Sequence, residues 1–93
     1  MYIHSKAYED IRWSNLKSER LKLVRSASFE EIIASELIAV KRHPKREDQD
    51  ILLFKCKGYI WIVPYVEEKD YIFLKTLYPS RKYTKLYRKG ELK

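Results

Sequence analysis

Residues 51–66, ILLFKCKGYIWIVPYV, are almost continuously apolar and rich in β-branched and aromatic side chains. This composition predicts two β-strands, over residues 51–57 and 59–66, joined by a turn at Lys57-Gly58. The second run has so few polar residues that we expect a central strand buried on both faces. Pro64 has no N–H to donate to a neighbouring strand, so we expect a bulge or the end of the strand there.

The chain after this stretch predicts one more strand and a short helix. Residues 67–70, EEKD, form a polar hairpin loop, and residues 71–78 predict the third strand of a meander. Pro79 marks the break between that strand and a C-terminal helix, which we expect from Ser80 onward. The helix is predicted by side chains that recur at spacings of three and four residues: Lys82, Tyr83, Leu86 and Tyr87.

Two helical patterns precede the strands. The first has Ser14 as its N-cap and a stripe at spacings of three and four residues: Trp13, Leu16, Arg20, Leu23, Val24 and Ala27. Ser28-Phe29-Glu30-Glu31 predicts a capping box that starts a second helix, whose apolar face continues through Leu37 to Val40. Residues 41–50 contain no apolar side chain except Pro44 and predict a solvated loop.

Helices followed by a strand meander predict an α+β domain. We expect the two N-terminal helices to pack on one face of a small antiparallel sheet, with the short helix at the C-terminal end. Residues 1–93 should form one domain, since a single hydrophobic core usually serves about 50–200 residues. The other face of the sheet is expected to be freer and to carry side chains such as Tyr59, Trp61 and Lys75.

Composition excludes several classes of protein. With 45% hydrophobic and 14% aromatic residues, 2 Gly and 3 Pro, the chain is neither disordered nor collagenous. No run approaches the roughly 18 apolar residues of a membrane span, and the first residues lack the apolar segment of a signal peptide. A single cysteine cannot form an internal disulfide, so we expect a cytoplasmic protein.

Basic charge is concentrated in two parts of the chain. The formal net charge is +7, from 20 Lys+Arg and 13 Asp+Glu. Residues 79–93 hold six basic residues and one acid, hence +5, and residues 12–25 hold five and one, hence +4. Such clustering suits a polyanion such as nucleic acid, while a solubilising surface is the simpler alternative.

Residues 78–89, YPSRKYTKLYRK, interleave basic residues with tyrosines. Arg and Lys bind phosphates, and tyrosine rings stack on unpaired bases. The same groups can cleave RNA without metal, because they can move the protons of the ribose 2′-OH and the leaving oxygen and stabilise charge developing at phosphorus. This chemistry predicts catalytic roles for Arg81, Lys82, Tyr83 and His43. It predicts nucleic-acid contacts for Lys41, Tyr78, Lys85, Arg88 and Lys89.

Other chemistries find little support in the sequence. In the basic loop around His43, positive charge favours a neutral imidazole suited to a general base, although a solvated loop histidine is the simpler interpretation. Histidine and cysteine residues lack the spacing of metal ligands, so we predict no metal and no cofactor. Cys56 is expected to be a small buried hydrophobe.

Particular residues resemble a known family, the BrnT-type toxins. In chain order they are Trp13-Ser14, Lys17, Ser28-Phe29-Glu30-Glu31, Gly58 at the first hairpin, and Ser80-Arg81-Lys82 after the last strand. The likeness covers residues 11–87, and by position it assigns Lys17, Arg81 and Lys82 to the site. The chain departs from the family pattern at Val24-Arg25-Ser26, where the family often has Lys-His-Gly.

The resemblance implies the broad RelE/ParE-like fold and the toxin of a bacterial type II toxin–antitoxin system. Such a toxin would be a metal-independent endoribonuclease, an mRNA interferase that works by 2′-OH transesterification. Its partners would be a cognate antitoxin encoded beside it and RNA, including ribosome-bound mRNA, with no membrane. Two alternatives stay open: a non-catalytic RNA- or ribosome-binding module, and a basic module that binds an acidic protein.

RNA affinity should fall steeply as salt rises, because each phosphate neutralised by Lys or Arg releases counterions. For a single strand, the logarithm of affinity should fall by about 0.7 per phosphate contact for each tenfold rise in salt. Titration of a labelled single-stranded RNA at several salt concentrations measures this slope. A flat response would contradict nucleic-acid binding by the basic clusters.

Overall fold

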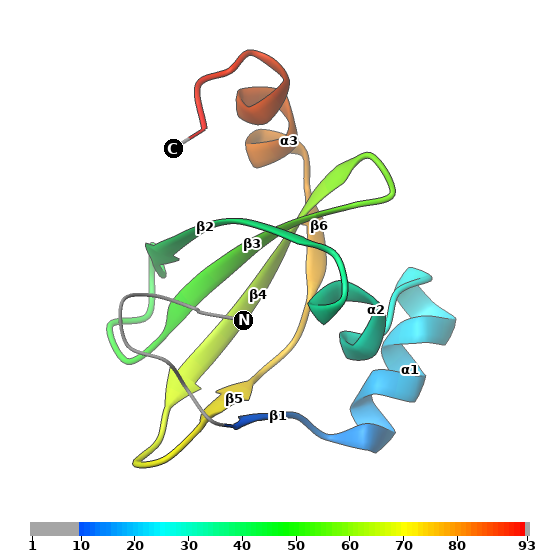
Figure 1. Ribbon diagram of the computed structural model, residues 1–93, viewed down its shortest axis with the longest axis vertical. Coiled ribbons are helices and arrows are strands. Elements are labelled where there is room, and N and C mark those ends of the chain that lie inside the picture. The colour runs from blue at the N-terminus through cyan, green and yellow to red at the C-terminus, as the bar shows by residue number, and fades with distance from the viewer. Residues whose placement is uncertain (1–9, 93) are drawn as a thin grey trace.

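The computed structural model describes residues 10–92, which form three helices and six strands (Figure 1). The elements are β1 (Ile11–Arg12), α1 (Asn15–Arg25), α2 (Phe29–Ile33), β2 (Glu36–Arg42), β3 (Asp50–Cys56), β4 (Tyr59–Glu67), β5 (Ile72–Leu74), β6 (Tyr78–Ser80) and α3 (Arg81–Arg88). This mixed architecture confirms the predicted α+β class. In the described part of the chain, no helix has the length and apolar character needed to cross a membrane.

All six strands belong to one sheet, in the order β1-β5-β4-β3-β2, with β6 also paired to β4. Every pair is antiparallel except β1 with β5. β4 is central, and its residues from Ile60 to Tyr65 are all buried, which confirms the predicted central strand. Strands β3 and β4 begin and end within one residue of the prediction.

The irregularity expected at Pro64 lies on the neighbouring strand. β4 continues through Pro64, while the predicted third strand is divided into β5 and β6. Tyr65 pairs with Leu74 and Ile62 with Tyr78, so two residues of β4 face three on the other side. Pro64 offers a carbonyl but no N–H, and its carbonyl accepts the Lys75 N–H at 2.8 Å. The prediction of one continuous strand over residues 71–78 is therefore wrong.

The predicted second helix is much shorter than expected. Its capping box is present, with Ser28 accepting from the Glu31 N–H and Glu31 accepting from the Ser28 N–H, but α2 ends at Ile33. Leu37 and Val40 belong to β2, which pairs with β3. An irregularity between Leu37 and Ala39 brings Leu37 and Val40 to the same side of the sheet. Their spacing of three residues therefore matches the helical period although both lie in a strand. The prediction that the helix continues to Val40 is wrong.

The face that α1 turns to the core is also not the predicted one. Trp13 and Ala27, at the two ends of the stripe, pack in the core outside the helix. Within the helix the buried residues are Ser18 and Leu21, while Leu16, Leu23 and Val24 are 68%, 86% and 71% exposed. Ser18 faces inward because its hydroxyl has hydrogen-bond partners there. A prediction from hydrophobicity alone would place this polar residue on the solvent side of the helix.

Helices cover both faces of the sheet. On one face, side chains from β3, β4 and β5 pack with Leu21 of α1 and with Phe29 and Ile32 of α2. On the other face, Tyr83 and Tyr87 of α3 pack against a cluster that includes residues of β3 and β4. The expectation of a freer face is therefore wrong. Trp61, which is 7% exposed, packs in the core cluster that the sheet forms with α1 and α2, which we call the α1–α2 cluster.

Ser18 joins α1 to α2 through two hydrogen bonds. Its hydroxyl donates to a carboxylate oxygen of Glu30 and accepts the Phe29 N–H at 3.0 Å. The other Glu30 oxygen accepts from the Trp13 indole at 3.3 Å. A few residues away, Lys22 contacts both oxygens of Glu31 at 2.8 and 2.9 Å. The helix hairpin is thus held by polar contacts at the edge of the core.

Ser18→Ala should destabilise the protein by about 1–3 kcal/mol, because the buried Phe29 N–H loses its partner. Thermal unfolding should then occur several degrees lower, since about 1 kcal/mol shifts Tm by about 4–8 °C in a domain of this size. Glu19→Ala, on the exposed side of the same helix, is the matched control and should change stability by less than about 0.5 kcal/mol. Equal Tm values for the two variants would contradict the role of Ser18.

Acid should weaken the α1–α2 hairpin. The hydrogen bond from Ser18 lowers the pKa of Glu30 below its ordinary value of 4.5, and the Lys22 ammonium lowers the pKa of Glu31. A carboxyl whose pKa is lower in the folded state stabilises the fold above its ordinary pKa and loses that contribution as pH falls. Urea unfolding at neutral pH and at about pH 3.5 should show a smaller loss of stability for Glu30→Gln than for the wild type. An equal loss would contradict this linkage.

Candidate nucleic-acid interface

Two adjoining hollows lie at one end of the sheet. Together we call them the basic groove. The first has a volume of about 480 Å³ and is lined by Arg25, Lys57, Tyr59, Trp61, Pro79 and Arg81. The second, of about 380 Å³, is lined by Tyr59, Arg81, Thr84, Lys85, Arg88 and Lys89. Tyr59 and Arg81 belong to both hollows, so they mark the middle of the groove.

Arg81 owes its position to the way α3 is attached to the sheet. It is the first residue of α3, directly after the N-cap Ser80, whose hydroxyl accepts the Tyr83 N–H at 3.0 Å. The buried Thr84 hydroxyl donates to the Ser80 carbonyl at 2.6 Å and accepts the Ile60 N–H at 2.9 Å. The first turn of α3 is thus bonded to β4, and the Arg81 backbone has a fixed place beside the groove.

The opposite wall comes from the β3–β4 turn and the end of α1. Lys57 and Gly58 have φ of 55° and 77°, as in the tight hairpin turns that match strand twist. The Lys57 ammonium donates to the Ser26 carbonyl at 2.9 Å, just past the end of α1. Arg25, the last residue of α1, donates to the Leu77 carbonyl at 2.8 Å. These bonds hold two cations near Arg81 from segments far apart in the sequence.

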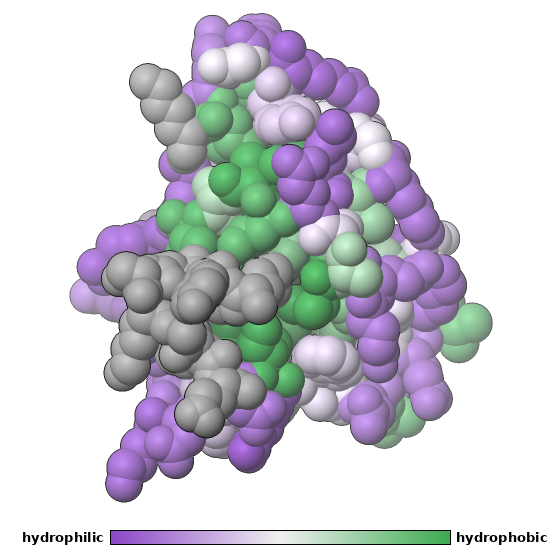
Figure 2. Space-filling view, in the orientation of Figure 1, coloured by the Kyte–Doolittle hydropathy of each residue, from purple (hydrophilic) through white to green (hydrophobic). Residues whose placement is uncertain are grey.

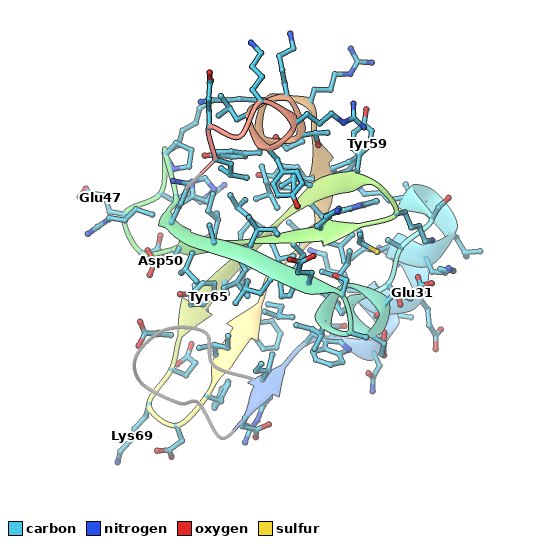
Figure 3. All side chains as sticks on the ribbon, turned by 45° about the horizontal axis from the view of Figure 1, so that its top comes forward. Glu31, Glu47, Asp50, Tyr59, Tyr65 and Lys69 are labelled. Carbon is cyan, nitrogen blue, oxygen red and sulfur yellow. The ribbon has the colours of Figure 1, made fainter. Side chains whose placement is uncertain are left out.

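Two aromatic side chains lie among these cations. The Trp61 indole donates to the Cys56 carbonyl at 3.0 Å, which fixes its orientation. Tyr59 is 37% exposed and lies beside α3 (Figure 3). The Arg88 guanidinium is 5.8 Å from the centroid of the Tyr59 ring and donates to the Gly58 carbonyl at 3.2 Å. The Tyr59 ring is therefore held in place by its neighbours and keeps part of its surface exposed, which suits stacking on an unpaired base.

The groove is strongly positive. Six of its side chains are cationic, and none of its lining residues within 10–92 is acidic. In the described part of the chain, the one ion pair that involves a lining residue joins the Lys57 ammonium to the Glu31 carboxylate at 3.9 Å. A concave surface of one charge sign raises the local concentration of ligands of opposite charge. Phosphates are the fitting ligand class, and the aromatic rings add a contact for bases.

The structure brings together four of the predicted site residues. Arg81, Lys85, Arg88 and Lys89 line the groove. Lys82 and Tyr83, also on α3, line neither of its hollows: the Lys82 ammonium is 5.6 Å from the Tyr83 ring centroid, and Tyr83 packs against the sheet.

Another three predicted residues meet in a separate hollow of about 340 Å³. This hollow is lined by Lys17, His43, Arg46, Gln49, Pro64, Lys75, Thr76 and Tyr78. The Tyr78 ring also lies 5.7 Å from the Arg25 guanidinium, which belongs to the groove. Lys41, half-buried in β2, lines none of these three hollows.

His43 holds its own loop together. Its Nδ1 accepts the backbone N–H groups of Lys45 at 3.1 Å and Arg46 at 3.2 Å. These two bonds engage the Nδ1 lone pair within the loop, so only Nε2 is left to meet a ligand. His43 is therefore a cap of its own loop.

Sequence reasoning missed Arg25 and Lys57 as groove residues. The Lys57-Gly58 turn indicated a lysine at the tip of a hairpin, and Arg25 belonged to a basic helix. Their approach to Arg81 depends on contacts between residues more than twenty positions apart, which no local pattern contains. Tyr59 and Trp61 were expected on a free sheet face and instead lie at the groove, where Trp61 is largely buried.

The described residues do not suggest a metal centre. Within residues 10–92, no three His, Cys, Asp or Glu side chains gather in a way that could hold a metal ion. Cys56 is a half-buried free thiol that packs against the α1–α2 cluster.

Comparison with known proteins shows a likeness of fold. No protein-family model matches the chain, and no curated protein matches it. Among solved structures, the chain is similar to the crystal structure of the Brucella abortus ribonuclease toxin BrnT, with a TM-score of 0.50 and 13% sequence identity. The match covers 75% of this chain and 94% of the Brucella chain. The protein therefore has a BrnT-like fold.

Proposed function

We propose that this chain is the RNA-cleaving toxin of a type II toxin–antitoxin system, acting in the cytoplasm, and that the basic groove is its RNA site. The observation that carries the proposal is the meeting of Arg25, Lys57 and Arg81 around Tyr59. The similar solved structure is that of a ribonuclease toxin, and the family resemblance in the sequence points the same way. A place in the wider RelE/ParE-like superfamily is part of this proposal.

Single-stranded RNA is the substrate form that fits the groove. Lys and Arg side chains from three segments can follow successive phosphates, from Lys57 at the hairpin tip to Lys89 at the end of α3. An unpaired base can stack on Tyr59, because a base in a duplex does not expose its face.

Cleavage would proceed by attack of the ribose 2′-oxygen on the adjacent phosphorus. The 2′-OH gives its proton to a base, the new 2′-O–P bond forms, and the P–O5′ bond breaks as O5′ gains a proton. The products are a 2′,3′-cyclic phosphate and a 5′-hydroxyl. Arg81 would stabilise the negative charge on the phosphoryl oxygens. The groove groups able to move protons are Tyr59 and the lysines Lys57, Lys85 and Lys89. Lys82, Tyr83 and His43 remain alternatives for proton transfer if RNA also crosses their surfaces.

Arg81→Ala should slow cleavage more than it weakens RNA binding, since it removes a group that acts on the transition state. Loss of one such donor typically costs about 2.7–4 kcal/mol, or a hundred- to a thousandfold in rate. Arg81→Lys keeps the charge but loses the planar fork that grips two oxygens, so it should recover binding and only part of the rate. Single-turnover cleavage, RNA affinity and Tm are measured for each variant.

The matched control for Arg81 is Arg42→Ala, an exposed arginine at the end of β2 that lines none of the three hollows. It should leave cleavage, RNA affinity and Tm unchanged. If Arg81→Ala lowers Tm and affects binding and cleavage equally, Arg81 is a structural residue. RNA binding by the wild type without any cleavage would favour a non-catalytic RNA-binding module instead.

A further inference from the structure

The outward face of α1 carries an apolar stripe that the fold does not use. We define the α1 stripe as Leu16, Arg20, Leu23 and Val24. At 100° per residue these four lie within about 100° of one another, and the core-facing Ser18 and Leu21 lie about 170° and 110° from the middle of the stripe. The three aliphatic members are each more than two-thirds exposed. Figure 2 shows hydrophobic atoms protruding at its right-hand edge, over α1, among hydrophilic ones.

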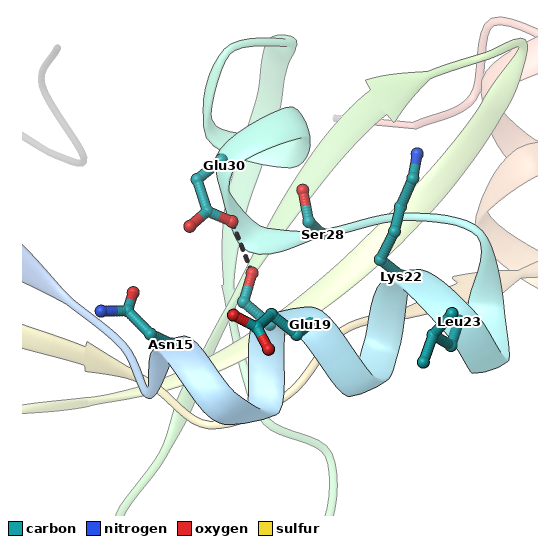
Figure 4. Close-up of a pocket in the computed structure, with 7 residues that line it drawn as sticks. Asn15, Glu19, Lys22, Leu23, Ser28 and Glu30 are labelled. Carbon is teal, nitrogen blue, oxygen red and sulfur yellow. Dashed lines mark hydrogen bonds between the residues drawn. The ribbon is translucent and has the colours of Figure 1, made fainter.

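The α1 stripe adjoins a hollow of about 520 Å³ between α1 and α2 (Figure 4). Leu23 belongs to both the stripe and the hollow, whose other lining residues are Asn15, Ser18, Glu19, Lys22, Ser28 and Glu30. The Ser18 hydroxyl already donates a hydrogen bond to the Glu30 carboxylate, so these polar groups of the hollow have partners without a ligand. A row of aliphatic side chains beside such a hollow is the arrangement that receives an amphipathic helix.

The charge of α1 favours one kind of partner helix. α1 contains four basic residues and one acid, Glu19, hence +3. Within residues 10–92, neither Lys17 nor Arg20 takes part in an ion pair. A second copy of this chain would bring another +3 helix against the first, which is unfavourable. An acidic helix would find Arg20 within the stripe and Lys17 beside it, on the side away from Glu19 and Glu30 of the hollow.

We propose that the α1 stripe binds an acidic amphipathic helix of a separate protein. The identity of the partner rests on the proposed function, in which the protein encoded beside this chain neutralises it.

The test is the affinity of this chain for the protein encoded beside it, measured by titration calorimetry. Leu16→Asp and Leu23→Asp should weaken the complex by about tenfold to a hundredfold, since each places a carboxylate in the apolar contact. Arg20→Glu should weaken it by about tenfold. Lys69→Ala, in the loop between β4 and β5 away from α1, makes the same change of charge as Leu23→Asp and should have no effect (Figure 3). Hydrogen exchange should show protection of residues 15–25 in the complex.

RNA binding separates the outcomes. The two Leu→Asp variants should keep wild-type RNA affinity and Tm, because both side chains are exposed and lie outside the basic groove. Unchanged partner affinity in these variants, or no complex with the wild type, overturns the proposal. A wild-type dimer that becomes a monomer in Leu23→Asp also overturns it, since the occupant is then a second copy. Loss of the complex in the variants, with no RNA cleavage by the wild type, leaves this surface standing and refutes the toxin activity.

Discussion

Burial of β4 on both faces is the constraint on which the other elements depend. β4 pairs with β3 on one edge and with β5 and β6 on the other, so its backbone is bonded along most of its length. Both of its faces then need apolar cover, which α1 and α2 provide on one side and α3 on the other. The basic groove forms where these two layers meet, at the β3–β4 turn, because the end of α1 and the start of α3 both reach that end of the sheet.

Hydrogen bonds between separate segments hold the groove together. Thr84 bonds α3 to β4, Trp61 is bonded to the Cys56 carbonyl, and Lys57 and Arg25 each reach a backbone carbonyl of another segment. These contacts place the cations without neutralising them, since carbonyls orient a cation and leave its charge to act on a ligand. Such preorganisation reduces the free energy spent on ordering the site when an anion binds.

The two faces of α1 have different physical roles. Its inner face is held by a serine and a leucine, with the hydroxyl of Ser18 shared between Glu30 and the Phe29 N–H. A polar inward position leaves the aliphatic residues of the same helix on the outside. Because exposed aliphatic side chains contribute little to the stability of a monomer, a row of them suits contact with a molecule outside the fold.

The sequence alone determined the elements whose signals are local. The apolar runs on either side of Lys57-Gly58 defined β3 and β4, Ser28 and Glu31 defined the start of α2, and Ser80 after Pro79 defined the start of α3. Tertiary structure decided the rest. Pairing with β3 made a strand of Leu37 and Val40, whose spacing also fits a helix, and hydrogen bonds to Glu30 and Phe29 turned α1 so that Ser18 faces inward. The basic charge of the C-terminal segment was visible in the sequence, but the meeting of Arg25, Lys57 and Arg81 was not, because it depends on contacts between segments that only the folded sheet brings together.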